Sequence, residues 1–186
     1  MKNPYEIGDK IYLRSPTLED AEGDWFQWFS DPEITMYLSD RNQPNTKEAQ
    51  VAFYKSLENQ KDRIVLSICR KENDKHIGVC GFSQINWFNR YADIAYIIGN
   101  KEKDSGLIIV EVMKLLLSIA FDRLGLDNLR STHTASNQKT PVISKMFGFK
   151  EVGSMKNLVF FKGKKEDLII SQLTKQDWSA RNNDSS

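Results

Sequence analysis

The chain has 186 residues, of which 40% are hydrophobic and 11% aromatic, enough apolar side chains for the core of one domain. Its 26 Lys and Arg residues balance 25 Asp and Glu residues, and the formal net charge of +1 argues against binding to nucleic acid or an anionic membrane surface. No stretch approaches the roughly 20 apolar residues of a membrane span, and residues 1–6 lack the apolar segment of a secretory signal, so we expect a cytoplasmic protein.

The cysteines and histidines do not predict a metal site. Cys69 and Cys80 lie in apolar, strand-like segments, where we expect them to be buried, reduced thiols. With His76 and His133 as the two histidines, they form no recognisable zinc-binding pattern. We therefore expect no structural metal.

The first third of the chain is predicted to contain one strand and then helices. A β-like run at 11–14 is followed by Thr17 and Asp20, a hydroxyl and an acid spaced as in a capping box. Aromatic residues at helical spacing continue this helix to an Asp-Pro break. A third helix is expected at 46–60, and the short second helix before it should carry Ile34, Tyr37 and Leu38.

The middle and the C-terminal half alternate between strand and helix patterns. Three β-rich runs at 64–68, 77–82 and 92–98, separated by polar turns, predict an antiparallel meander. From Leu107 to Leu124 the few polar residues recur at intervals of three and four, which predicts a long, mostly buried helix. Gly125 is expected to end it.

A strand at 129–134 and a short helix are expected next. Thr140 and Pro141 predict the cap and the first position of this helix, and Gly148 its end. Its expected buried face consists of Val142, Ile143, Met146 and Phe147. Two final strands should complete a single domain over residues 10–178, preceded by a lead-in at 1–9 and followed by a disordered tail at 179–186.

Several short motifs follow one another in an informative order. They are Trp28-Phe29-Ser30-Asp31-Pro32-Glu33-Ile34-Thr35, Ile77-Gly78, Ala92–Ile98, Ala120–Leu126, Asn137 with Thr140, and Phe147–Gly153. In this order they resemble the GNAT superfamily of N-acetyltransferases, and within it the RimJ/RimL-like branch that acetylates ribosomal-protein amino termini. The resemblance covers about residues 10–178 and implies a mixed α/β fold. Its mostly antiparallel sheet, of about six to seven strands, would be flanked by helices and splayed between the fourth and fifth strands.

In that family acetyl-coenzyme A lies in the opening of the sheet, with its pyrophosphate on the amino terminus of the long helix. Free backbone N–H groups and the helix dipole favour a phosphate there. By position the fourth strand is 92–98, the fifth is 129–134 and the phosphate loop is 101–107. The resemblance therefore implies a set of cofactor-binding residues: Tyr96, Ile97, Ile98, Lys103, Asp104, Ser105, Gly106, Leu107 and Asn137.

The phosphate loop departs from the family pattern. Relatives usually carry two glycines in an Arg-x-x-Gly-x-Gly/Ala arrangement, whereas this chain keeps Gly106 and has Asp104 in place of the first glycine. A nest of amides needs backbone direction more than a particular side chain, which favours a retained but weaker coenzyme site over a lost one. The chain also has one residue more than its relatives between this loop and Phe121.

Acyl transfer to an amine needs a base for the ammonium group. Asp93 is an acid in an otherwise apolar strand, at a position where this branch often has Glu. The alternative is a solvent-facing Asp93 paired with Arg90. His133 is a second candidate base, although a lone histidine in a strand is more often structural.

The resemblance implies the other roles in the reaction. Backbone N–H groups of residues 96–98 would bind the oxyanion. Asn137 matches an asparagine that hydrogen-bonds the coenzyme or positions the following helix, and the alternative is an ordinary loop residue. The family's thiolate acid is a tyrosine at the position of Ser144. Because an alkyl hydroxyl is a poor acid, Ser144 either relays a proton through water or takes no part.

Two functions remain open at this point. The first is an N-acetyltransferase that moves an acetyl group from acetyl-CoA to a primary amine of a small metabolite, an amino sugar or a protein amino terminus. The second is an idle GNAT-like domain that binds acyl-CoA or another partner without turnover, suggested by the missing glycine and tyrosine. Acceptor choice is expected to depend on the loops around 31–46 and 84–91. We expect a monomer or homodimer with no nucleic-acid partner.

Overall fold

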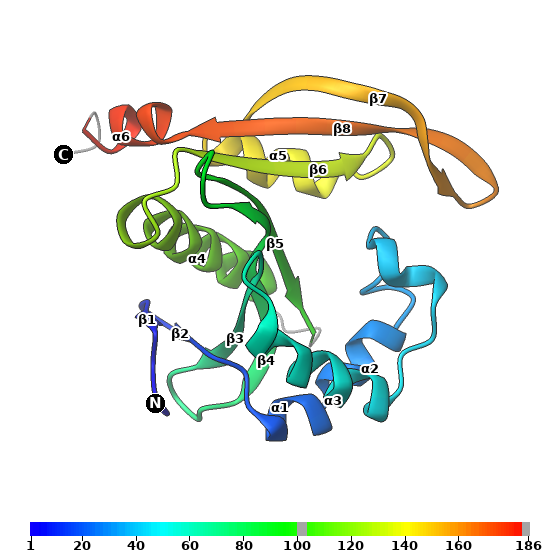
Figure 1. Cartoon of the computed structure of the whole chain (residues 1–186), viewed down its shortest axis with the longest axis vertical. Helices are drawn as coiled ribbons and strands as arrows, with labels where there is room; N and C mark the ends of the chain where they lie inside the picture. The colour runs from blue at the N-terminus through cyan, green and yellow to red at the C-terminus, as the bar shows by residue number, and fades with distance from the viewer. Residues whose placement is uncertain (100–103, 184–186) are drawn as a thin grey trace.

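The computed structural model describes residues 1–99 and 104–183, and its eight strands form one sheet in the order β1-β2-β3-β4-β5-β6-β8-β7 (Figure 1). The predicted meander is confirmed, because the three middle strands pair antiparallel. The sheet has more strands than expected, since residues 6–7 pair with β2. The strands are β1 (Glu6–Ile7), β2 (Ile11–Arg14), β3 (Ile64–Arg70), β4 (His76–Asn86), β5 (Tyr91–Ile98), β6 (Asn128–Thr134), β7 (Lys150–Phe161) and β8 (Lys164–Thr174).

Helices cover both faces of this sheet. One face packs against α4 and builds the larger core with Ile68, Ala92 and Leu116. The other face packs against α1 to α3 through a smaller core that contains Trp25 and Val79. The helical segments are α1 (Leu18–Glu22), α2 (Trp25–Ser30), η1 (Ser39–Asn42), α3 (Lys47–Ser56), η2 (Leu57–Asn59), α4 (Ser105–Ser118), η3 (Ile119–Arg123), α5 (Lys139–Met146) and α6 (Lys175–Asn183).

The capping box that begins α1 is confirmed: the Asp20 N–H donates to the Thr17 hydroxyl, and the Asp20 carboxylate accepts from the Thr17 N–H. The predicted short helix around Ile34 is wrong. Residues 31–38 form separate turns, because Tyr37 leaves the helical path to stack on Phe161 at 5.3 Å and to donate to the Ser136 carbonyl. A tertiary contact therefore overrides the local pattern here.

The long buried helix is confirmed and ends in an unusual turn. After α4, residues 119–123 form a π-helical turn in which the Leu124 N–H donates to the Ile119 carbonyl. Such a turn accommodates one residue more than an α-helical turn, which fits the extra residue that the family resemblance indicates. Gly125, at φ +65°, ends the helix as predicted.

The start and the buried face of α5 differ from the prediction. The cap is Asn137, whose Oδ1 accepts from the N–H groups of Lys139 and Thr140, so Thr140 lies inside the first turn. The helix turns a different face to the sheet than predicted: Val142 and Met146 are exposed and Ser144 is buried, whereas Ile143 and Phe147 pack against the core as expected. The predicted end of the helix at Gly148 is confirmed by its φ of +89°.

The end of the chain is more ordered than expected. β7 and β8 form a long hairpin, and α6 continues through residues 179–183 of the predicted disordered tail, with 184–186 outside the described residues. The Trp178 ring packs on Phe121 at 5.1 Å, which anchors α6 to the core. Within the described part of the chain, no helix has the length and apolar character needed to cross a bilayer.

The two cysteines are free and buried, as predicted. Burial raises the pKa of both the Cys69 and the Cys80 thiol, so both stay protonated at neutral pH.

Candidate active site

The sheet opens between β5 and β6, as the resemblance implies. These parallel strands pair only at Tyr91 with Asn128, Ala92 with Leu129 and Asp93 with Arg130. Beyond that point β5 stays paired with β4 as far as Ile98, and β6 stays paired with β8 as far as Thr134. Figure 1 shows the two strands diverging toward their carboxyl ends. The edge of β5 that follows Asp93 therefore faces an opening instead of a neighbouring strand.

Backbone donors of β5 point into this opening. The Gly99 N–H donates to the Ile77 carbonyl of β4 at 2.8 Å, so strand alternation turns the Ile97 N–H toward β4 as well. The N–H groups of Tyr96 and Ile98 then point to the β6 side, where the pairing has ended. Their side chains pack into the core beside α4 and fix this backbone in place. Of the three predicted residues, two present donors to the opening and Ile97 does not.

The amino terminus of α4 is open to solvent. Gly106 and Leu107 are exposed, and a Cβ built on Gly106 would meet no atom of the described chain within 4 Å. Asp104 is the N-cap of the helix, but its side chain accepts no hydrogen bond from a first-turn N–H, and its carboxylate instead pairs with Arg70 at 2.6 Å. Ser105 is half-buried in the first turn, and Lys103 lies outside the described residues. This open first turn fits a phosphate group.

Asp93 lies at the point where the opening begins. Its carboxylate accepts a hydrogen bond from Arg130 Nε at 2.6 Å, and Arg130 also lies over the Tyr91 ring. The alternative partner, Arg90, pairs with Asp127 instead. Asp93 is therefore held by an ion pair across the last paired position of β5 and β6.

We expect Asp93→Asn to lower turnover across the pH range, while the affinity for acetyl-CoA stays within about threefold, because a base acts on the amine. Steady-state rates between pH 5 and 9, with calorimetric binding beside them, measure both effects. A profile that overlays the wild type would show that the Asp93–Arg130 pair is structural.

His133 lies on the opposite face of β6 from Arg130. Alternation places it on the face of Ser131, whose hydroxyl contacts α5. Burial lowers the pKa of His133, an effect that the charge of Glu151 only partly opposes. The two predicted bases are therefore not brought together: Asp93 lies at the last position of β5 that pairs with β6, and His133 lies three residues beyond the last position of β6 that pairs with β5.

Ser144 is buried, and its hydroxyl is paired with another serine. Its hydroxyl lies 3.3 Å from the Ser131 hydroxyl, between α5 and β6, and 5% of the residue is exposed. Asn137 is also buried and holds Thr140 as well as the first amides of α5, which supports the positioning role over that of an ordinary loop residue.

We expect Ser144→Ala to reduce turnover by less than tenfold, whereas loss of a true general acid costs about a hundredfold or more. The hydroxyl is a weak acid and already pairs with Ser131. Single-turnover rates at saturating acetyl-CoA give this ratio, and Ser131→Ala serves as the matched control. A hundredfold loss confined to Ser144→Ala would assign the hydroxyl a direct role.

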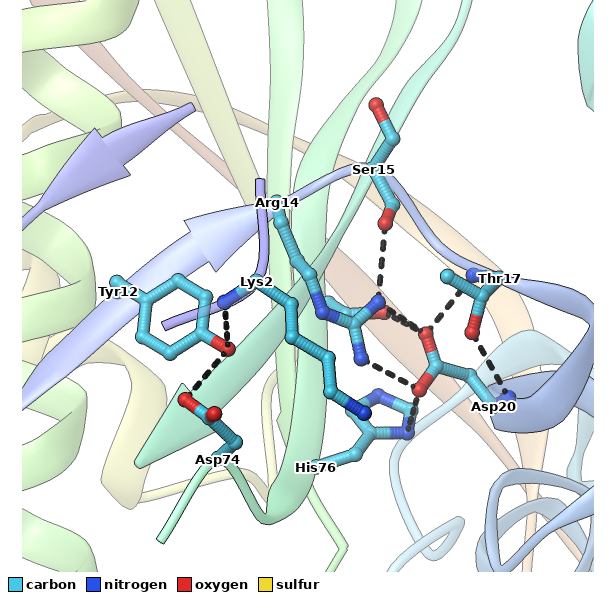
Figure 2. A network of polar contacts seen from close by, with 9 residues as sticks. Lys2, Tyr12, Arg14, Ser15, Thr17, Asp20, Asp74 and His76 are labelled. Atoms are coloured by element: carbon cyan, nitrogen blue, oxygen red, sulfur yellow. Dashed lines mark hydrogen bonds and ion pairs between the residues drawn. The ribbon is translucent and has the colours of Figure 1, made fainter. Parts of the chain in front are cut away.

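A second polar cluster lies away from the opening (Figure 2). Arg14 donates two hydrogen bonds to the Asp20 carboxylate, at 2.6 and 2.8 Å, and Ser67 and His76 contact the same carboxylate. A surface cavity of about 470 Å³ borders the cluster, and its walls come from the first residues, the end of β2, α1 and the β3–β4 turn. No lining residue belongs to β5, β6 or α4. The cluster joins α1 to the sheet.

The comparisons with known proteins agree with this geometry. A sequence profile described as an acetyltransferase (GNAT) domain matches residues 10–150. The chain belongs to the GNAT family. It is 29% identical over 175 residues to the uncharacterized N-acetyltransferase p20 of Bacillus licheniformis, an alignment that covers 92% of this chain and 96% of p20.

A further relative and a solved structure differ in how much of the chain they match. YdaF of Bacillus subtilis, provisionally named a ribosomal N-acetyltransferase, is 27% identical over 101 residues, 54% of this chain and 55% of its own. The structure of a spermidine N-acetyltransferase from Vibrio cholerae with CoA and spermine has a TM-score of 0.83 at 17% identity and covers 92% of this chain and 99% of that one. At 17% identity, the similarity to this solved structure shows a shared fold alone.

The sequence did not single out two arginines of this GNAT site, Arg70 and Arg130. Arg70 ends an apolar strand, which is the signal that could have marked it as the partner of a nearby acid, whereas Arg130 lies in a mostly polar strand and carries no such signal. Within the described residues, no three His, Cys, Asp or Glu side chains are placed to hold a metal ion.

Proposed function

We propose that this GNAT protein transfers the acetyl group of acetyl-CoA to a primary amine, and that it does so in the opening between β5 and β6. The observation that carries the proposal is the early end of β5–β6 pairing at Asp93 and Arg130, beside an open amino terminus of α4. Together these provide a place for the thioester and a place for the pyrophosphate.

Bound acetyl-CoA supplies a thioester whose carbonyl carbon is open to attack by an amine. The chain supplies the electrostatics: the N–H groups of Tyr96 and Ile98 are directed at the opening and would stabilise a carbonyl oxygen that gains negative charge. The first-turn amides of α4 would hold phosphate oxygens. An alkyl ammonium is deprotonated in about one molecule in a thousand at neutral pH, so we assign Asp93 to receive this proton.

We propose that the acceptor enters on the face of the sheet that carries Asp93. The segment between α2 and α3 crosses there to β7, because Tyr37 stacks on Phe161 and the Arg41 guanidinium lies 5.3 Å above the same ring. Arg41 also donates to the Phe160 carbonyl. This supports the expectation that residues 31–46 shape acceptor choice.

The motif order supports membership of the RimJ/RimL-like branch. With that branch we propose a protein amino terminus as the acceptor and the cytoplasm as the location. An amino sugar and a small polyamine, such as the spermidine named for the Vibrio cholerae neighbour, are the other acceptors to test.

The experiment is a thiol-release assay with acetyl-CoA and a panel of peptide amino termini, amino sugars and polyamines, read together with the mass of each acceptor. Thiol release matched by an acetylated amine is the expected result. Tight coenzyme binding without thiol release on any acceptor would favour the idle GNAT-like domain.

A further inference from the structure

Asp104, which replaces a glycine in the phosphate loop, is paired with an arginine. Arg70, at the end of β3, donates from Nη1 to Asp104 Oδ2 at 2.9 Å and from Nη2 to Oδ1 at 2.6 Å. This is a bidentate pair, the strongest arrangement of these two side chains. The Arg70 side chain is 11% exposed, so the sheet holds the guanidinium in place.

The pair with Arg70 keeps the Asp104 side chain from capping α4. An Asp at the cap of a helix ordinarily accepts a hydrogen bond from an amide of the first turn. Here the Asp104 side chain makes no such bond, because both of its oxygens accept from Arg70. Hydrogen bonds from Arg70 also hold the pKa of Asp104 below its usual value. The Asp104 carboxylate is thus charged, its charge is balanced by Arg70, and it makes no hydrogen bond with the first-turn amides.

An uncompensated carboxylate at this position would oppose a pyrophosphate in two ways. It would compete for the same amides, and it would repel the phosphate charges over a few ångströms. Gly106 and Leu107, the second and third residues of α4, remain exposed.

We propose that Arg70 is a positioning residue for the coenzyme: it withdraws the Asp104 carboxylate from the amino terminus of α4 so that the first-turn amides can bind the pyrophosphate. This inference rests on the proposed function, since it takes acetyl-CoA as the ligand. It explains how the loop keeps its role although an aspartate stands where relatives have a glycine.

The test is a double-mutant cycle with calorimetric dissociation constants for CoA. Arg70→Gln leaves the Asp104 carboxylate charged and without its bidentate partner, with Lys10 still a nearby positive charge, and we expect at least a tenfold weaker affinity. Asp104→Asn alone should change the affinity less than threefold. In the double variant Arg70→Gln/Asp104→Asn the affinity should return to within threefold of the wild type, because the repelling charge has gone.

A double variant as weak as Arg70→Gln would overturn the proposal, since Arg70 would then contact the coenzyme itself. An unchanged affinity in Arg70→Gln would overturn it too. The cycle is repeated with 3′-dephospho-CoA, which keeps the pyrophosphate, and the tenfold loss must persist. If the loss disappears, the pair acts on the ribose phosphate and the inference fails.

Two controls keep the outcomes separate. Circular dichroism and thermal melting check that each variant is folded. If Arg70→Gln does not fold, Arg70→Lys takes its place. The lysine keeps the positive charge but cannot form the two parallel hydrogen bonds to Asp104. An affinity for CoA equal to that of the wild type would contradict the proposal. A wild-type protein that binds no CoA would refute the proposed function, whereas wild-type binding that is insensitive to Arg70 would refute this inference alone.

Discussion

Asp20→Asn is expected to lower the free energy of unfolding by about 3 to 5 kcal/mol, the cost of leaving a buried charge without its partner. The Asp20 carboxylate holds Arg14 through two hydrogen bonds and accepts others from Ser67 and the Thr17 N–H. Asn is nearly isosteric, but it is uncharged and presents an NH₂ group to a cluster of donors. The guanidinium of Arg14 would remain buried without a counter-charge.

The matched control is Asp127→Asn. Asp127 pairs with Arg90 on the surface, where the two side chains are 40% and 60% exposed, and such a pair contributes about 0 to 1 kcal/mol. Urea denaturation at pH 7 measures both variants. If Asp20→Asn costs no more than Asp127→Asn, the buried cluster does not stabilise the fold.

The same cluster makes stability depend on pH. Burial alone would raise the pKa of Asp20, but the hydrogen bonds that Arg14 donates and the charge of the nearby His76 lower it from 3.8 to about 2. A depressed carboxyl pKa stabilises the fold above pH 4 and loses that effect as the pH falls toward 2. Burial lowers the pKa of His76 below 6.5, against the raising effect of Asp20, so stability also decreases as the pH falls through 6.5. Asp20→Asn should make the dependence between pH 4 and 2 shallower, and the part that remains belongs to the other carboxyl groups whose pKa is lowered, Asp74, Asp104, Asp167 and Asp177.

Gly106→Glu is expected to weaken acetyl-CoA binding by roughly ten- to a hundredfold. A carboxylate about 5 Å from a phosphate charge costs about 1 to 3 kcal/mol at effective dielectric constants between those of water and a protein surface. The protein itself should tolerate the change, because a Cβ at this position meets nothing within 4 Å among the described atoms.

Two variants at the same position separate charge from size. Gly106→Gln has the length of Glu without its charge and should bind CoA more tightly than Gly106→Glu. Gly106→Ala adds only a methyl group and should stabilise α4 through its higher helix propensity. Calorimetry on proteins verified by circular dichroism gives the comparison. Equal affinity in all three variants would mean that the phosphate does not bind at this turn.

Local patterns in the sequence predict most of the elements of this fold. The alternation in 64–98 gives the meander, and the spacing of polar residues in 107–124 gives α4, because each pattern reports one buried face. The predictions fail where a contact with a residue distant in the sequence determines the local conformation. Tyr37 leaves a helical pattern to reach Phe161, and Asn137 begins α5 ahead of the stronger local signal at Thr140 and Pro141.

The candidate site is predictable only in part for a similar reason. The family motifs indicate which strands separate and which helix receives the phosphate, and the structure has that opening. The arginines that hold the two site acids are 34 and 37 residues from their partners in the sequence. No local pattern joins Arg70 to Asp104 or Arg130 to Asp93, because the packing of α4 on the sheet makes the first pair and the pairing of β5 with β6 makes the second. Arg90, the sequence neighbour named as the alternative partner of Asp93, instead pairs with Asp127.

The most direct test of the account is amide-resolved NMR of the ¹⁵N-labelled protein, with hydrogen exchange recorded before and after saturation with coenzyme A. The amides of Tyr96 and Ile98 face the opening, whereas the Ile97 amide faces β4 and serves as an internal control. We predict that exchange at Tyr96, Ile98 and Gly106 slows and that their resonances shift, while Ile97 changes little. Saturable binding that leaves these amides unchanged, with shifts confined to the cavity beside Arg14 and His76, would contradict the assignment of the β5–β6 opening as the coenzyme site.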